Sequence, residues 1–234
     1  IVWAPDREQA RRRMIGAPYS YPAKAAFGRV IPKNRIYEHG HIGKALRERF
    51  VAQVDRITWA YKLAPETTNL PERGGVQEIQ IIELHQRGKD LDTPVLLAID
   101  KVIPKPILFH LRYGAQVRMA AAHKRPSEAD GNKWVIGEHY LGDWYPENAD
   151  RQALPIALDL QGLYEQLLRG LLPQPARPGE SIAAHLDRVE AIRRFDRERA
   201  KLDAQLQREK QFNRKVALNA QLRTVNQQIE ALTA

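Results

Sequence analysis

Apolar residues recur at steps of three and four along the last part of the chain, from Ser181 to Ala234, which contains neither glycine nor proline. That period places the apolar side chains on one face of a helix. Such a stripe is typical of a coiled-coil seam, which is buried only when it packs against another helix. The pattern therefore predicts a structural or interaction role for this segment. The residues of the stripe are Ile182, Leu186, Val189, Ile192, Leu202, Leu206, Leu218, Leu222, Val225, Ile229 and Leu232.

The stripe does not run continuously through the segment. Leu206 and Leu218 are twelve residues apart, which at about 100° per residue leaves them about 120° apart around a straight helix. A helical hairpin explains this change if the chain reverses near Asn213, because asparagine tolerates the left-handed conformation that ends many helices. The alternative is one long helix with a stutter, packed on a partner. We favour the hairpin.

An amphipathic helix is predicted from Gly43 to Leu63. Apolar residues follow one another there at steps of four, four, three and four, which is the spacing of one helix face. Pro65 and Pro71 come next, and they are expected to end the helix in a loop. The apolar residues of this face are Leu46, Phe50, Val54, Ile57 and Tyr61.

The middle of the chain changes to the period of two that is typical of strands. Proline in the first turn indicates a helix that begins at Thr93, and Tyr113-Gly114 indicates the turn of a hairpin. The order of these elements predicts an α+β fold with a mostly antiparallel sheet and packed helices. Strands are predicted at Val76–Leu84, Pro106–Arg112, Gln116–His123 and Lys133–Tyr140, and helices at Thr93–Val102 and Pro155–Leu172.

These patterns divide the chain into four parts. We expect a basic N-terminal arm at 1–26, an α+β core domain at 27–172, a proline-rich linker at 173–180 and a helical hairpin or coiled coil at 181–234.

No apolar run approaches the roughly 20 residues that span a bilayer. The absence of cysteine excludes disulfides, thiolate metal sites and a cysteine nucleophile, and it suits a reducing compartment. A cytoplasmic protein is therefore expected.

The net charge of +9 is concentrated toward the two ends of the chain. From Arg208 to Arg223 five lysines or arginines accompany a single acid, Glu209, so the expected hairpin tip is basic. Such a patch is typical of contact with phosphates or with an acidic partner, but a solvated helix surface explains it as well. The candidate contact residues are Arg11, Arg12, Arg13, Lys33, Arg35, Arg208, Lys210, Arg214 and Lys215.

Known catalytic patterns are missing from the sequence. It has no phosphate-binding loop, no dinucleotide fingerprint and no serine-hydrolase elbow. His39 and His41 lack a second pair of ligands for a metal. Restriction-type nucleases hold magnesium with an acid and an acid-x-Lys triplet on neighbouring strands, and Asp100-Lys101 has the wrong spacing for that arrangement. We therefore expect a non-enzymatic protein with no catalytic residue, no cofactor and no metal site.

A polar cluster from Lys33 to His39 precedes the first long predicted helix. It combines two cations, an amide, a phenol, an acid and an imidazole. Such a cluster could bind an anion or cap the helix that follows. The simpler interpretation is a helix-entry loop that ties the arm to the core, and we favour it.

Four segments of the chain resemble an uncharacterised bacterial protein family of similar size. They are Phe27–Glu38, Tyr61–Thr67, Lys124–Glu128 and Glu209–Lys215. Members of that family tend to be encoded beside DNA methyltransferases and helicases in restriction-like or anti-phage defence clusters. The resemblance implies an accessory role in such a system, and it implies no catalytic residue.

Two functions from different classes follow. The first is an accessory subunit that docks through its helical tail on a larger partner, a helicase or DNA methyltransferase of the same system, with DNA contact as an addition. The alternative is a stand-alone, non-specific DNA-binding module, and a metal-dependent nuclease is the least favoured reading. Self-association through the tail also stays open. The residues of the partner-helix seam are Leu202, Leu206, Leu218, Leu222, Val225 and Ile229.

Overall fold

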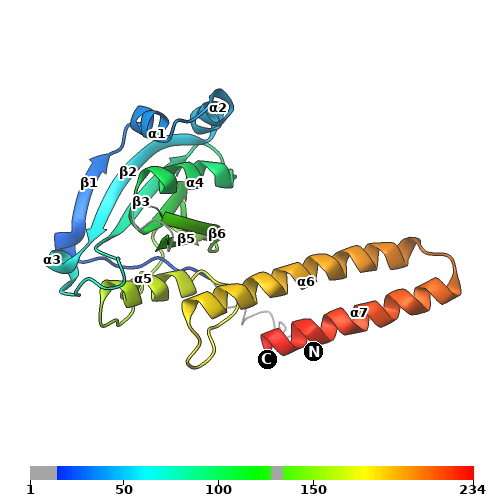
Figure 1. The fold of residues 1–234 in the computed structure, drawn as a ribbon. Coiled ribbons are helices and arrows are strands. Elements are labelled where there is room, and N and C mark those ends of the chain that lie inside the picture. Colours follow the sequence, from blue (N-terminus) through cyan, green and yellow to red (C-terminus); the bar gives the residue numbers. More distant parts are fainter. Residues whose placement is uncertain (1–14, 128–133) are drawn as a thin grey trace, which may run out of the picture. The chain divides into compact units, whose positions relative to one another are not determined.

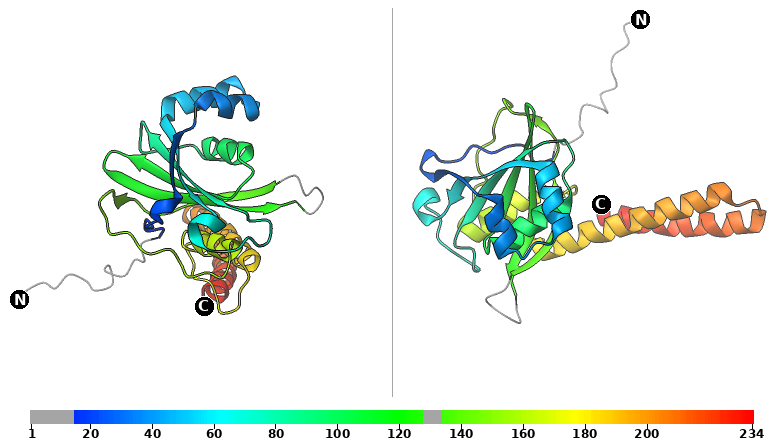
Figure 2. Two further views of the ribbon diagram at one scale, coloured as in Figure 1. Left: turned by 90° about the vertical axis from the view of Figure 1, so that its left-hand side faces the viewer. Right: turned by 90° about the horizontal axis from the view of Figure 1, so that it is seen from above.

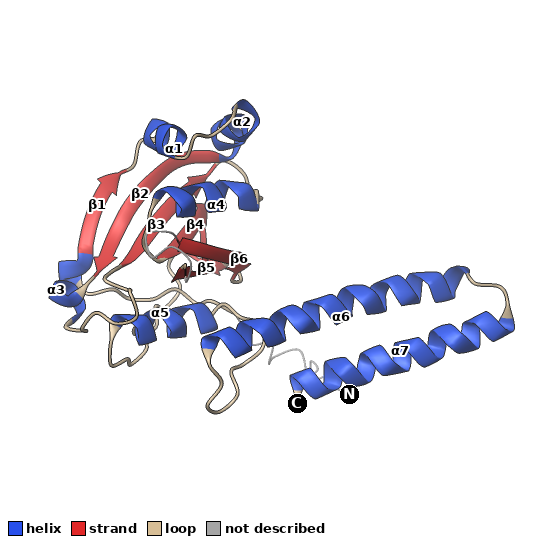
Figure 3. Ribbon diagram, viewed as in Figure 1, coloured by secondary structure: helices blue, strands red, loops and turns tan. Residues whose placement is uncertain are grey.

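The computed structural model describes residues 15–127 and 134–234. They form two compact units that divide between Leu172 and Pro173. The first unit is a mixed α+β domain built on one sheet, and the second is almost wholly helical (Figure 3). The predicted fold class is confirmed, and each unit is described by itself below.

The sheet of the first unit has the strand order β1-β2-β3-β4-β5-β6, and β7 pairs with β5 (Figure 1). All of these pairings are antiparallel except that of β3 with β4, which is parallel. A parallel pair needs a crossover connection, and helix α4 supplies it. The strands are β1 (Ala26–Val30), β2 (Val54–Leu63), β3 (Ile79–Gln86), β4 (Ile107–Tyr113), β5 (Gln116–Pro126), β6 (Trp134–Leu141) and β7 (Tyr145–Pro146).

Helices cover both faces of this sheet (Figures 1 and 2). On one face α1, α2 and α4 enclose a core around Phe50, Leu96 and Phe109, each of which is fully buried. On the other face lies α5, whose Tyr164 hydroxyl donates to the carbonyl oxygen of Ala122 in β5 over 2.6 Å. The helices of this unit are the 3-10 turn η2 (Ala23–Ala25), α1 (Lys33–His39), α2 (Lys44–Gln53), α3 (Pro65–Thr68), α4 (Thr93–Val102) and α5 (Leu160–Arg169).

The predicted helix from Gly43 to Leu63 is wrong in its second half, because α2 ends at Gln53 and β2 begins at Val54. The register between β2 and β3 shifts between Val54 and Arg56. Such a bulge adds one residue to a strand, so Val54 and Ile57 are both buried although they stand three residues apart. The bulge thus imitates the spacing of a helix, whereas the β-branched and aromatic composition of this segment favours a strand.

Two other expectations are corrected. Lys33–His39 is not a loop but helix α1, which buries Ile36 against the core. The helix expected from Pro155 begins only at Leu160, where the Asp159 side chain accepts a hydrogen bond from the backbone N–H of Gly162 and caps it. Ile156 and Leu158 precede that cap and are 94% and 86% exposed.

The described part of the expected arm lies against the core domain. Tyr19 is buried, and the backbone N–H of Ser20 donates to the carbonyl oxygen of Gln152 over 2.8 Å. Tyr21 reaches into the sheet, where its hydroxyl lies 2.8 Å from Nε2 of His110. The segment from Ile15 onward is therefore part of the first unit.

The second unit is a helical hairpin of α6 (Ile182–Arg208) and α7 (Phe212–Thr233), which run side by side (Figure 3). This confirms the hairpin over the continuous helix. The reversal is not at Asn213, which lies inside α7, but at Glu209–Gln211. Glu209 and Gln211 both have extended backbone conformations, so the turn uses no left-handed residue.

Candidate functional site at the hairpin tip

The base of the hairpin is closed by two arginines. Arg188 donates through Nη1 to the carbonyl oxygen of Leu232, and Arg177 donates through Nη2 to that of Ala231. Cations are favoured at a helix C-terminus because its last carbonyls lack partners. Arg188 also holds Glu180, with 2.7 Å between Nε and Oε1, and this pairing lowers the pKa of Glu180 to about 2. The cations at the base are thus engaged inside the unit.

The seam along the middle of the hairpin is also buried, because the two arms pack against each other. All six predicted seam residues belong to one apolar cluster, in which Leu202, Leu222 and Val225 are buried and Leu206, Leu218 and Ile229 pack against them. Phe195 joins the same cluster. The partner helix that the stripe requires is therefore the other arm of the same chain. The seam is not left open for a second protein.

The tip of the hairpin holds one carboxylate among several cations. Oε1 of Glu209 accepts hydrogen bonds from the backbone N–H groups of Lys210 and Gln211, each at 2.8 Å, and its Oε2 lies 3.9 Å from Nη1 of Arg214. The backbone hydrogen bonds lower the pKa of Glu209, as do the charges of Arg214 and Lys215. This carboxylate thus stabilises the turn before α7 and compensates only part of the surrounding charge.

Three cations of the tip have no carboxylate partner within 4.0 Å among the residues that the structure describes: Arg208, Lys210 and Lys215. All three are exposed: Arg208 ends α6, Lys210 lies in the turn and Lys215 lies in the first turn of α7. Phe212 and Val216, one helical turn apart on α7, are 78% and 53% exposed beside them. The tip therefore combines free positive charge with an apolar pair.

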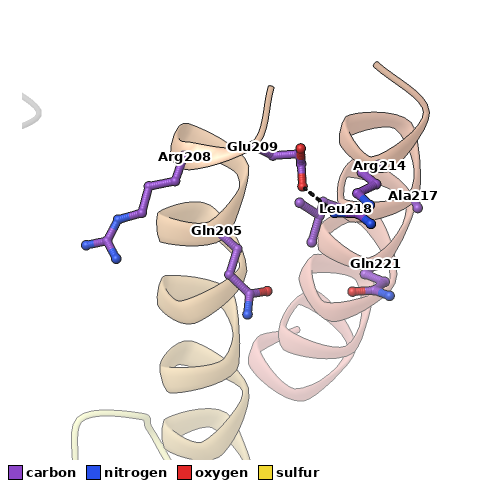
Figure 4. Close-up of a pocket in the computed structure, with 7 residues that line it drawn as sticks. All are labelled: Gln205, Arg208, Glu209, Arg214, Ala217, Leu218 and Gln221. Atoms are coloured by element: carbon purple, nitrogen blue, oxygen red, sulfur yellow. Dashed lines mark ion pairs between the residues drawn. The ribbon is translucent and has the colours of Figure 1, made fainter. Parts of the chain in front are cut away.

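A cleft of about 470 Å³ opens between the two arms just below the turn (Figure 4). Its polar lining consists of guanidinium and amide groups with the one carboxylate, and the ion pair of Glu209 with Arg214 crosses it. Guanidinium groups suit phosphate oxygens, and amides can donate or accept. The lining residues are Gln205, Arg208, Glu209, Arg214, Ala217, Leu218 and Gln221.

The other predicted contact residues belong to the first unit or lie outside the described residues. Lys33 begins α1, and its ammonium donates to the carbonyl oxygen of Val54 at the junction of α2 and β2. Burial and the charge of Arg87 lower the pKa of Lys33. Lys33 therefore has a structural bond, whereas Arg35 is exposed on the same helix. Arg11, Arg12 and Arg13 lie outside the described residues.

The histidines form no metal site in the part of the chain that the structure describes. Among those residues, no group of three or more histidine, cysteine, aspartate or glutamate side chains is arranged to hold an ion. His39 and His41 are exposed at the end of α1 and in the loop after it. Likewise, within residues 15–127 and 134–234 no helix has the length and apolar character that a membrane span requires.

A buried ionic network in the first unit was missed by the sequence analysis. Nε2 of His139 donates to Oδ2 of Asp100 over 2.6 Å, and Nζ of Lys124 lies 3.3 Å from Oδ1 of the same carboxylate. The ammonium also donates to the carbonyl oxygens of Asp100 and Ile103 at the end of α4. All three side chains are at most 3% exposed. Their inaccessibility indicates a structural role, which joins α4 to β5 and β6.

A second polar cluster, on the face of the sheet that α5 covers in part, was also missed. Oε1 of Glu83 in β3 lies 2.9 Å from Nη2 of Arg112 in β4 and 4.0 Å from Nδ1 of His110. His110 is buried, its Nδ1 has no hydrogen-bond partner, and burial together with the charge of Arg112 lowers its pKa to about 3. No local sequence pattern predicts this cluster, because its members lie on two strands, β3 and β4, that only the sheet register brings together.

Comparison with known proteins identifies a family. A family model described as a domain of unknown function, DUF4391, matches residues 20–229. No curated protein and no solved structure matches the chain.

Proposed function

Starting from the membership of this chain in the DUF4391 family, which spans residues 20–229, we propose that it is a cytoplasmic accessory subunit that contacts DNA through the basic tip of its helical hairpin. The observation that carries the proposal is the gathering of four cations and one paired carboxylate at the turn, where two of the cations, Arg208 and Arg214, line an open cleft. The residues of this basic tip are Arg208, Lys210, Arg214 and Lys215.

Charge and geometry both support a phosphate ligand. Phosphate contacts supply most of the affinity of sequence-tolerant DNA binding, because each neutralised phosphate releases condensed counterions. The hairpin is closed at its base and packed along its seam, so it holds its tip cations on two helix ends and the turn between them. The amide groups of Gln205 and Gln221 beside the cleft add donors for phosphate or sugar oxygens.

The finer setting of the proposal rests on the resemblance described above. In that setting the chain serves a restriction-like or anti-phage defence system and acts beside a helicase or DNA methyltransferase. The accessory role assigns no catalytic residue and no cofactor to the hairpin.

Titration of the full chain against labelled duplex DNA, at two salt concentrations, tests the proposal. Four phosphate contacts give a slope of log K against log salt of about −3.6, which is a loss of affinity of about 150-fold between 50 and 200 mM salt. The combined change Lys210→Glu, Arg214→Glu and Lys215→Glu should abolish binding. Unchanged affinity in this variant would refute the proposal.

A matched control reverses the same number of charges elsewhere. Lys44, Lys89 and Lys101 are exposed on the first unit, and changing all three to glutamate lowers the net charge equally. DNA binding through the tip predicts nearly normal affinity in this control. An equal loss in both variants would mean that net charge, and not the tip, governs binding.

Docking on a larger protein is a second candidate, and the exposed pair Phe212 and Val216 favours it. Because the seam is buried inside the hairpin, a partner must use an outer surface of the hairpin. The double change Phe212→Ser and Val216→Ser should stop a co-expressed helicase or methyltransferase from co-purifying with the chain. Retention of the partner would exclude this pair as the docking surface.

A further inference from the structure

The polar cluster on the sheet continues from β4 across β3 to β2. Nη2 of Arg56 in β2 lies 3.1 Å from Nε2 of His85, and that same nitrogen lies 3.8 Å from Oε2 of Glu83. Arg112 completes the row from β4. We call these four residues, Arg56, Glu83, His85 and Arg112, the sheet-face cluster.

Glu83, His85 and Arg112 lie in the C-terminal halves of two parallel strands, β3 and β4, which α4 connects, and Arg56 lies near the start of β2. The side chains of Glu83 and Arg112 are 16% and 15% exposed, and that of His85 is 31% exposed. These side chains are thus partly buried and still accessible to solvent.

The cluster combines a carboxylate, an imidazole and two guanidinium groups in a row, with 3.1 Å from Arg56 to His85, 3.8 Å from His85 to Glu83 and 2.9 Å from Glu83 to Arg112. A carboxylate can accept a proton, an imidazolium can donate one, and guanidinium groups stabilise the charge of a phosphate in a transition state. These are the groups that in-line cleavage of RNA requires when the attacking oxygen is the neighbouring 2′-hydroxyl.

We propose that the sheet-face cluster cleaves RNA phosphodiesters by general acid–base catalysis. Glu83 takes the proton of the 2′-hydroxyl while the 2′-oxygen bonds to phosphorus. The bond from phosphorus to the 5′-oxygen breaks, and the leaving oxygen takes a proton from the His85 imidazolium. The products are a 2′,3′-cyclic phosphate and a 5′-hydroxyl, and Arg56 and Arg112 bind the phosphate oxygens.

In the free protein each arginine of the cluster is paired with one of the two proposed catalytic groups, which it would release when phosphate binds. Arg56 donates to Nε2 of His85, and Arg112 pairs with Glu83 and with Glu147. A bound phosphate competes for both guanidinium groups. Its arrival therefore frees Nε2 of His85 to carry a proton and leaves the Glu83 carboxylate free to accept one.

His110 serves as a positioning residue beneath the carboxylate. Its Nε2 forms a hydrogen bond with the hydroxyl of Tyr21. Its Nδ1 is buried, has no hydrogen-bond partner and lies 4.0 Å from Oε1 of Glu83. A shift of Glu83 by about 1 Å toward His110 brings the two into hydrogen-bonding range. Release of Arg112 by the phosphate allows that shift.

The test uses the full chain and a labelled oligonucleotide with one ribonucleotide in a DNA strand, in buffer with EDTA. Wild-type protein should cut beside the ribonucleotide and leave the cyclic phosphate, and an all-deoxy strand of the same sequence should stay intact. Glu83→Gln and His85→Gln should each lower the rate at least about 100-fold. His39→Gln changes an exposed histidine outside the cluster and should leave the rate unchanged.

Two results would overturn the proposal. One is the absence of cleavage by wild-type protein, and the other is cleavage that persists equally in both variants, which would reveal a contaminating nuclease. If Glu83→Gln lowers the melting temperature, His85→Gln decides the question, because His85 is the more exposed residue. Cleavage of a dinucleotide by the variant with Lys210, Arg214 and Lys215 changed to glutamate separates this site from the hairpin tip.

Discussion

Replacing Lys124 by methionine should be among the most destabilising single changes in the first unit. Methionine keeps much of the length of the lysine side chain but removes its ammonium. In the native structure this ammonium contacts Oδ1 of Asp100 and the carbonyl oxygens of Asp100 and Ile103. The variant therefore leaves a buried carboxylate with His139 alone, together with two helix-end carbonyls that lose their donor.

The magnitude follows from these losses. Removing one partner of a buried ion pair costs about 3–5 kcal/mol, because the remaining charge stays desolvated. Burial lowers the pKa of Lys124 and the charge of Asp100 raises it in part, so the pair already carries a desolvation cost. The double variant Lys124→Met with Asp100→Asn removes both charges. It should therefore lose less stability than the sum of the two single changes.

Urea denaturation followed by tryptophan fluorescence measures these free energies of unfolding. A matched control is Lys101→Met on α4, the helix that carries Asp100, because the side chain of Lys101 is exposed. Its effect should stay within about 0.5 kcal/mol. A loss below about 1 kcal/mol for Lys124→Met would refute the reasoning. Strict additivity in the double variant would show that the two residues are not coupled.

Three further predictions concern other parts of the molecule. The pKa of His110 is lowered from 6.5 to about 3 in the folded protein. As pH drops from about 6.5 toward 3, the unfolded chain therefore takes up a proton at this histidine before the folded protein does, and stability falls. His110→Gln should flatten that part of a profile of stability against pH. Leu222→Ala should cost about 2 kcal/mol in the hairpin, seen in helical melting by circular dichroism, and an unchanged melting curve would argue against the seam of α6 and α7. Asp159→Ala removes the cap of α5 and should cost about 1 kcal/mol in urea denaturation, whereas Asp159→Asn should retain most of it.

Local periodicity was sufficient for several elements. The helix predicted from Thr93 to Val102 has those bounds in the structure, and the turn at Tyr113-Gly114 joins β4 to β5. The stripe that ends at Leu206 and resumes at Leu218 indicated the hairpin correctly. In each case the burial pattern of a short segment records which side of it faces the core, so no distant contact has to be known.

Periodicity failed where the backbone departs from regular geometry. The bulge near Val54 gave a strand the spacing of a helix, and only the pairing of β2 with β3 reveals the extra residue. The reversal of the hairpin fell at Glu209–Gln211, where the Glu209 carboxylate accepts from two backbone N–H groups. Side chains that bond to nearby backbone can thus set a turn without a glycine or asparagine at the reversal.

The sequence by itself determined the α+β class of the first unit, the helical hairpin of the second and the basic charge of its tip. Only the tertiary structure decided which charged groups meet. Asp100 and Lys124 stand on a helix and a strand, and Glu83 meets Arg112 through the register of β3 with β4. Residue spacing along one element carries no record of such contacts, because they depend on how elements far apart in the chain align when the core is buried.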